Sequence, residues 1–237
     1  ARLNGNRTAF SDGPGLVQVF SPGLEKMVWT YDAGRAPSLS GEPPRVRALG
    51  GDVFVLVRRN HGCELNRLAP VDGESVWDDP AFLDADRVDL AATDVDDERV
   101  YVPAGTKLTA LLLEDGSAAW AAALPKLHGA AGWRVRAGKN VVIAYPVEAI
   151  PGEPVADVWV RVVRSFGRAP LAWRLPLLAD TLVETWADRT VPVLLFDPET
   201  GELLKCVVLP ARGPGVSAHF DGAVAVVVTG AGAAWLR

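Results

Sequence analysis

One group of side chains suited to ligand binding stands in "RRNHGCE", residues 58–64. Arg58, Arg59 and His61 offer several N–H donors within four positions, and such donors bind polar or anionic groups of a ligand or partner. We expect this stretch to connect two strands, because loops held on a rigid scaffold often carry binding residues. The alternative interpretation is an ordinary solvent-exposed hairpin with basic side chains.

A second candidate is the acidic stretch "DADRVDLAATDVDDERV", residues 84–100. Its acidic side chains are Asp84, Asp86, Asp89, Asp94, Asp96, Asp97 and Glu98. A calcium loop of the EF-hand type needs a glycine at its sixth position and a bidentate glutamate at its twelfth, and neither register is satisfied here. We therefore expect a solvated turn between two strands, and ion binding is the weaker alternative.

The remaining reactive side chains form no local motif. Cys63 and Cys206 stand 143 residues apart, which is unlike the short paired spacing of a zinc site or the density of a disulfide scaffold. His61, His128 and His219 are equally dispersed, no G-x-S-x-G occurs, and the glycine-rich stretches lack the Lys-Ser/Thr of a phosphate-binding loop. We predict no catalytic residue and no metal site.

Composition narrows the possible partners. The apolar residues of this 237-residue chain are 49% of the total but never form a run of ~18, so no membrane insertion is expected. A net charge of −5 disfavours nucleic acid, which binds concentrated Lys and Arg. No basic segment followed by an apolar one stands near Ala1, so a leader is either absent or already removed, and the compartment stays open.

A repeated hairpin organises the chain. "RLAPVDGESVW" (67–77), "ALLLEDGSAAW" (110–120) and "LLFDPETGELLK" (194–205) each place a glycine four residues before an anchor position. These glycines are Gly73, Gly116 and Gly201, and the anchors are Trp77, Trp120 and Lys205. Two looser copies end at Trp29 and Trp173, and successive anchors advance by 48, 43, 53 and 32 residues. Such glycines suit tight turns, because glycine adopts positive φ at little steric cost.

Each unit has about four strands. Runs such as "VFVLV" (53–57) and "RVYVP" (99–103) precede the hairpins, with short turn segments before them. Four-stranded units recurring every ~40–45 residues are typical of a β-propeller, in which stacking buries both faces of each sheet. We draw the units at 5–34, 44–80, 85–125, 131–177, 180–210 and 213–237. The expected fold is an all-β propeller of four-stranded antiparallel blades, with six blades and with five or seven left open.

The tryptophans have a structural interpretation in this fold. Trp29, Trp77, Trp120 and Trp173 are expected to lie between adjacent blades, where a large flat ring fills the gap and its N–H finds a partner. Gly73, Gly116 and Gly201 are expected to form the hairpin turns. These two sets of residues are predicted to lock each blade to its neighbour.

The hairpin units resemble the PQQ-like (quinoprotein-type) β-propeller repeat. The best match is "RVYVPAGTKLTALLLEDGSAAW" (99–120), and "VLLFDPETGELLK" (193–205) keeps the D-x-x-T-G core with Lys205 in place of tryptophan. The resemblance implies the fold for residues 1–237 as a single domain, which could be part of a longer protein. It does not imply activity: the quinone-dependent dehydrogenases of this class have eight blades, a vicinal cysteine pair and a Glu/Asn/Asp calcium site, so no cofactor is expected here.

An insertion offers a second candidate surface. "YPVEAIPGEPVADVW" (145–159) is longer than the corresponding "VPAGTKL" and carries Val147, Ile150 and Val155 among three prolines. A rigid apolar loop at a propeller rim suits docking of a protein or peptide. A loop that packs onto its own domain is the alternative.

Together, these expectations predict a non-catalytic protein-interaction scaffold. Like a WD40 propeller, it would bind its partner through the loops at its rim. Family members without cofactor residues include envelope assembly factors and adaptor domains, so the resemblance implies an extracytoplasmic location. We expect a monomer whose partner is a protein or peptide. The alternative is a small-ligand binder or quinoprotein-type enzyme that uses the central funnel.

Overall fold

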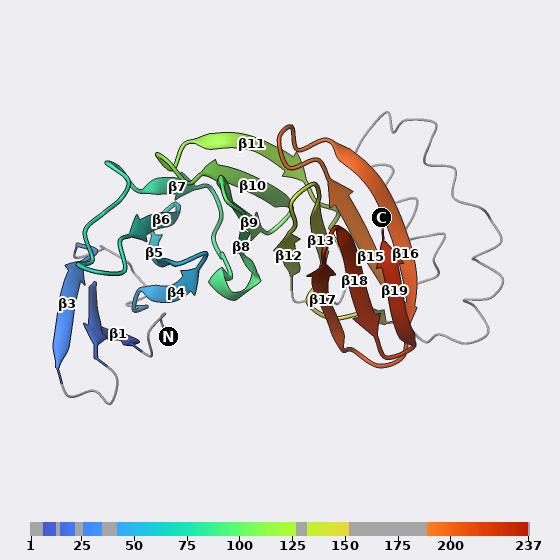
Figure 1. Ribbon diagram of the computed structural model, residues 1–237, viewed down its shortest axis with the longest axis horizontal. Coiled ribbons are helices and arrows are strands. Elements are labelled where there is room, and N and C mark those ends of the chain that lie inside the picture. Colours follow the sequence, from blue (N-terminus) through green and yellow to red (C-terminus); the bar gives the residue numbers. More distant parts are fainter. Residues whose placement is uncertain are drawn as a thin grey trace.

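Five antiparallel sheets follow one another along the described part of the chain and form an arc (Figure 1). The computed structural model describes residues 7–12, 15–21, 26–34, 42–126, 132–151 and 189–236. Sheet I contains β1 (Thr8–Asp12), β2 (Leu16–Phe20) and β3 (Met27–Asp32). Sheet II contains β4 (Arg45–Leu49), β5 (Asp52–Arg59), β6 (Gly62–Leu68) and β7 (Ala81–Leu83). Sheet III contains β8 (Asp94–Val95), β9 (Arg99–Ala104), β10 (Lys107–Leu112) and β11 (Ala118–Ala123), and a 3-10 helix, η3 (Leu90–Ala92), precedes it.

The C-terminal half holds the other two sheets. Sheet IV contains β12 (Trp133–Ala137), β13 (Val142–Pro146), β14 (Ile150–Pro151), β15 (Arg189–Phe196) and β16 (Leu203–Ala211). Sheet V contains β17 (Val216–Asp221), β18 (Val224–Thr229) and β19 (Gly232–Leu236). Sheets I and V lie at opposite ends of the arc, and β4, β8, β12 and β17 lie along its inner side (Figure 1).

Burial of both sheet faces explains the apolar runs. In β5, Phe54 and Leu56 join a buried cluster with sheet III, whereas Val53, Val55 and Val57 join a buried cluster with sheet I. Because successive side chains of a strand point to opposite faces, a strand covered on both sides must be apolar at every position. β9 and β15 divide their side chains between two clusters in the same way.

One expected boundary is wrong. The units drawn at 131–177 and 180–210 do not form separate sheets in the described residues, because β13 pairs directly with β15, with Val142 opposite Phe196. β15 then pairs with β16, so β12, β13, β15 and β16 make one sheet. The chain between β13 and β15 is therefore an insertion between the second and third strands of this unit. The expected hairpin at 162–173, with Trp173, lies outside the described residues.

Candidate functional site

Three hairpin turns share one hydrogen-bond pattern. The N–H of Gly73 donates to the carbonyl of Ala69 (3.0 Å), that of Gly116 to Leu112 (2.9 Å) and that of Gly201 to Asp197 (3.0 Å). The three glycines have φ values of +79°, +77° and +70°. Because a side chain in this left-handed region costs about 1–2 kcal/mol, the turn favours glycine.

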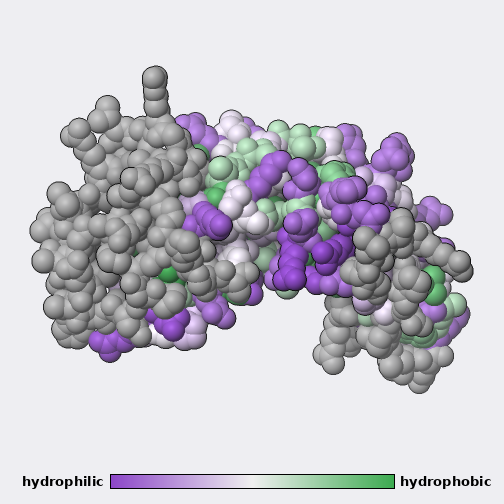
Figure 2. All heavy atoms as spheres, turned by 180° about the vertical axis from the view of Figure 1, so that it is seen from behind, coloured by the Kyte–Doolittle hydropathy of each residue, from purple (hydrophilic) through white to green (hydrophobic). Residues whose placement is uncertain are grey.

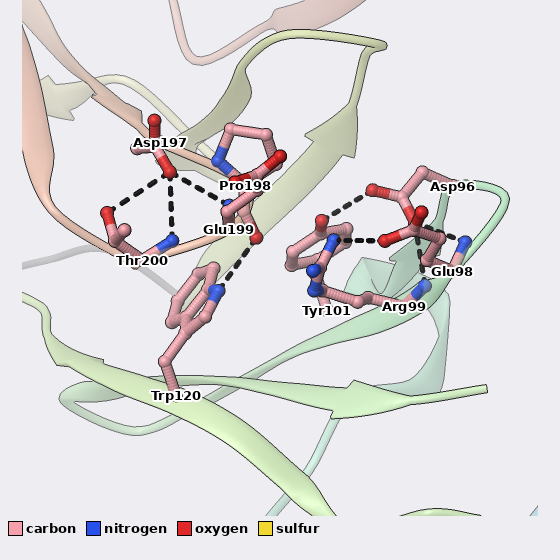
Figure 3. A network of polar contacts seen from close by, with 9 residues as sticks. All are labelled: Asp96, Glu98, Arg99, Tyr101, Trp120, Asp197, Pro198, Glu199 and Thr200. Carbon is pink, nitrogen blue, oxygen red and sulfur yellow. Dashed lines mark hydrogen bonds and ion pairs between the residues drawn. The ribbon is translucent and has the colours of Figure 1, made fainter. Parts of the chain in front are cut away.

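A tryptophan from the preceding structural unit contacts each of these turns. Indole N–H groups donate to turn carbonyls from Trp29 to Pro70 (3.1 Å), from Trp77 to Leu113 (2.9 Å) and from Trp120 to Pro198 (2.8 Å; Figure 3). The rings also cover the turn glycines: a Cβ atom would lie 2.4 Å from the Trp29 ring at Gly73, 2.7 Å from Trp77 at Gly116 and 2.5 Å from Trp120 at Gly201. Adjacent sheets are therefore joined by the same contact three times.

Arginines reinforce two of these contacts, and no spacing in the sequence points to them. Nη1 of Arg7 donates to the carbonyl of Pro70 (2.7 Å), and Nη1 of Arg67 donates to that of Leu113, so each carbonyl receives an indole and a guanidinium donor. Arg67 is also held by Asp52, with 2.7 Å between Nη2 and Oδ2. The number of residues between the arginine and its tryptophan differs between Arg7 and Arg67. The sequence therefore shows no common spacing that would point to their shared role.

The acidic stretch at 84–100 mainly organises local backbone. Asp89 accepts the N–H of Ala91 (2.9 Å) at the start of η3. Asp96 accepts the N–H groups of Glu98 (2.8 Å) and Arg99 (2.7 Å) and the hydroxyl of Tyr101 (2.5 Å; Figure 3). Burial, followed by this hydrogen bond, raises the pKa of Tyr101. Within the described ranges, no three His, Cys, Asp or Glu side chains gather as a metal site requires.

The loop ends of sheets II, III and IV surround one depression of about 510 Å³. Arg58 lines it, beside Glu42, with 3.4 Å between Arg58 Nη1 and Glu42 Oε1. Arg59 points to the other side of β5, where it pairs with Glu64 (2.6 Å) and donates to the carbonyl of Ala33 (3.1 Å). His61 is exposed at the β5–β6 turn. The depression therefore receives only Arg58 of the three predicted residues.

The apolar residues of the insertion differ in their accessibility. Ile150 is 0% exposed and lies in β14 opposite Thr190, so the expectation of an exposed side chain there is wrong: the strand pairing with β15 buries it. Val147 is half-buried, and its N–H donates to the carbonyl of Gly132 (2.9 Å). Val155 lies outside the described residues.

Both cysteines are buried, and burial raises the pKa of Cys206 to about 12 and also raises that of Cys63. A thiol reacts as its thiolate, so neither is expected to react with Ellman's reagent at neutral pH in the folded protein. Both should react after unfolding in urea. Rapid labelling of either thiol in the folded protein would contradict the described packing.

Asp197 should make part of the protein's stability depend on pH. The backbone N–H of Thr200 is the main cause that holds the pKa of Asp197 below its ordinary value, and the N–H of Glu199 adds to it. A lowered pKa in the folded state contributes stability that is present above the unfolded value of about 3.9 and is lost as the pH falls through the folded value.

Asp197→Asn should therefore lower Tm relative to the native chain at neutral pH, because it removes the charge but keeps an acceptor oxygen. The difference should shrink as the pH falls below about 4. Thermal unfolding followed by circular dichroism over a pH series measures it. A difference that stays constant with pH would show that the charge of Asp197 plays no part.

Repeated antiparallel sheets, stacked in an arc with the middle sheets buried on both faces, define a β-propeller. No family model and no curated protein sequence matches the chain. The described residues contain no helix long and apolar enough to cross a membrane.

Three solved structures with a similar fold are distant from this chain in sequence. The WD40 domain of Neurospora crassa Pan2 is 11% identical with a TM-score of 0.50, and the match covers 96% of this chain and 54% of that one. BamB from Moraxella catarrhalis is 14% identical (TM-score 0.43; 98% and 82% covered). Quinohemoprotein alcohol dehydrogenase from Comamonas testosteroni is 12% identical (TM-score 0.49; 98% and 41% covered). The similarity to the Pan2 domain supports the β-propeller fold that the sequence predicts.

Proposed function

We propose that this chain is a non-catalytic protein-interaction scaffold built on a PQQ-like β-propeller, with a protein or peptide as its partner. The observation that carries the proposal is the depression into which the loop ends of sheets II, III and IV converge. Loops from several sheets can present one composite surface to a partner, because the sheets beneath hold them in place.

The chemistry of the depression suits a peptide. Its apolar residues Leu56, Val88 and Trp133 are 4%, 2% and 5% exposed, and its charged residues Arg58 and Arg87 are more accessible. Protein interfaces commonly surround an apolar centre with a polar rim. The rim includes Glu42 and Asp86 as well, so both signs of charge are available to orient a peptide.

Selection from a random peptide library tests this proposal. We expect peptides that bind the native chain saturably and that bind Arg58→Gln/Arg87→Gln about tenfold or more weakly. The matched control is Lys107→Gln/Lys205→Gln, which also removes two positive charges but from exposed positions on β10 and β16. Equal binding to all three proteins, or no selected binder, would contradict a peptide site in the depression.

A further inference from the structure

Basic side chains gather on the inner side of the arc, on strands β4 and β12, which also contribute Arg45 and Trp133 to the depression described above. Arg47 belongs to β4, Asp94 to β8, and Arg134 and Arg136 to β12. These strands follow the inner side of the arc in Figure 1. Figure 2 shows the opposite view, in which hydrophilic side chains gather where the molecule is hollowed between its two ends.

Asp94 is the acidic group that contacts Arg136. Nη1 of Arg136 lies 3.8 Å from Oδ2 of Asp94, and its Nε donates to the carbonyl of Ala218 (3.2 Å). The same Oδ2 also accepts the N–H of Ala137 (3.1 Å). Oδ2 of Asp94 thus interacts with both a guanidinium and a backbone N–H. Because of this sharing, it neutralises the positive charge of Arg136 less fully.

Among the described residues, Arg47 is bound through backbone carbonyls in and after η3. Its Nη1 donates to the carbonyls of Leu90 and Thr93, both at 2.6 Å. Burial is the main cause that lowers the pKa of Arg47. Asp94 and Asp89 oppose this change, and Arg136 and Arg134 lower the pKa further. Arg136 and Arg134 are therefore close enough to Arg47 to act on its charge.

Arg134 has an incomplete hydrogen-bond shell. Its Nε is buried and has no acceptor among the described residues. A buried donor without an acceptor is unfavourable, and more so when the group is charged. Three positive side chains, of Arg47, Arg134 and Arg136, thus lie near two carboxylates, those of Asp89 and Asp94, in a chain whose net charge is −5.

We propose that the inner surface formed by Arg47, Arg134 and Arg136 binds an acidic peptide segment of the partner. Carboxylates would give charged acceptors to this surface, where Arg47 is bound by backbone carbonyls and Arg134 Nε has no acceptor among the described residues, and they pair with arginine through two parallel hydrogen bonds. A short acidic peptide can reach this local positive charge, whereas a long polyphosphate chain would also meet the overall negative charge of the protein. This inference rests on the proposed function as a protein-interaction scaffold and adds the chemistry of the partner.

Fluorescence anisotropy with a fluorescein-labelled oligoglutamate peptide tests the inference. We expect saturable binding to the native chain that weakens as salt is added, because salt screens charge pairs. Arg134→Gln/Arg136→Gln should bind about tenfold or more weakly, and the Lys107→Gln/Lys205→Gln control should bind within about twofold of the native chain. Arg134→Lys/Arg136→Lys keeps both charges and should retain more binding than the glutamine variant.

Circular dichroism shows whether each variant is folded. The salt series uses the native chain alone, so its result does not depend on the folding of any variant. Absence of saturable oligoglutamate binding, or an equal loss in the lysine control, would overturn the inference. Tighter binding of an oligothymidylate of equal charge would overturn the assignment to a peptide. If library-selected peptides still bind the depression while oligoglutamate does not, the inner-surface assignment fails and the scaffold function stands. If neither the library-selected peptides nor oligoglutamate bind, the inner-surface assignment and the scaffold function both fail.

Discussion

Replacing Trp120 with alanine is expected to lower the free energy of unfolding by about 3–5 kcal/mol. The Trp120 ring packs against Tyr101 and Phe196, with centroids 5.8 Å and 6.5 Å apart, and its N–H donates to the carbonyl of Pro198. Removing the ring leaves a cavity between sheets III and IV and an unpaired carbonyl. Urea unfolding followed by circular dichroism measures the change without depending on the fluorescence of the lost residue.

Trp235 provides the matched control for this change. It is 67% exposed, so Trp235→Ala should alter the free energy of unfolding by less than about 0.5 kcal/mol. Trp120→Phe should fall between the two, because it keeps most of the ring and loses the N–H. Equal effects of Trp120→Ala and Trp235→Ala would contradict the proposal that Trp120 locks adjacent blades together.

Gly116→Ala is expected to lower the free energy of unfolding by about 2–5 kcal/mol, the sum of two effects. Alanine at φ +77° costs about 1–2 kcal/mol. Its Cβ would also lie 2.7 Å from the Trp77 ring, and forcing extra volume into a packed site typically costs about 1–3 kcal/mol. Urea unfolding of the variant beside the native chain measures the loss.

Gly105 separates these two effects. It has φ +60° in another tight turn, and a Cβ atom there would meet nothing within 4 Å. Gly105→Ala should therefore lose only the backbone contribution of about 1–2 kcal/mol. If both variants lose the same amount, the contact between the Trp77 ring and the Gly116 turn does not contribute to stability.

The local hairpins could be predicted from the sequence because their determinants are local. A glycine four residues before the anchor marks each turn, and Gly73, Gly116 and Gly201 indeed have positive φ. The acceptors Pro70, Leu113 and Pro198 could not be predicted, because they depend on how one sheet packs against the next. The same holds for Arg7 and Arg67.

The boundary between the units drawn at 131–177 and 180–210 is wrong for a related reason. The segment at 162–173 resembles a repeat copy and so predicts a unit boundary after it, whereas Val142 pairs with Phe196 across the insertion. Residues that are adjacent in the sequence also need not contribute to the same site, because their side chains can point in opposite directions. Arg58 and Arg59 are adjacent in the sequence but point to opposite sides of β5, since strand residues alternate between faces.

Native mass spectrometry of the purified chain tests the proposed non-catalytic scaffold function most directly. The chain is measured alone, with pyrroloquinoline quinone and calcium, and with a peptide selected for the depression. The scaffold account predicts an unchanged mass with the quinone and calcium, and an increase by one peptide in the third sample. An increase by one quinone plus calcium, without peptide binding, would contradict it and indicate a cofactor site in the central funnel.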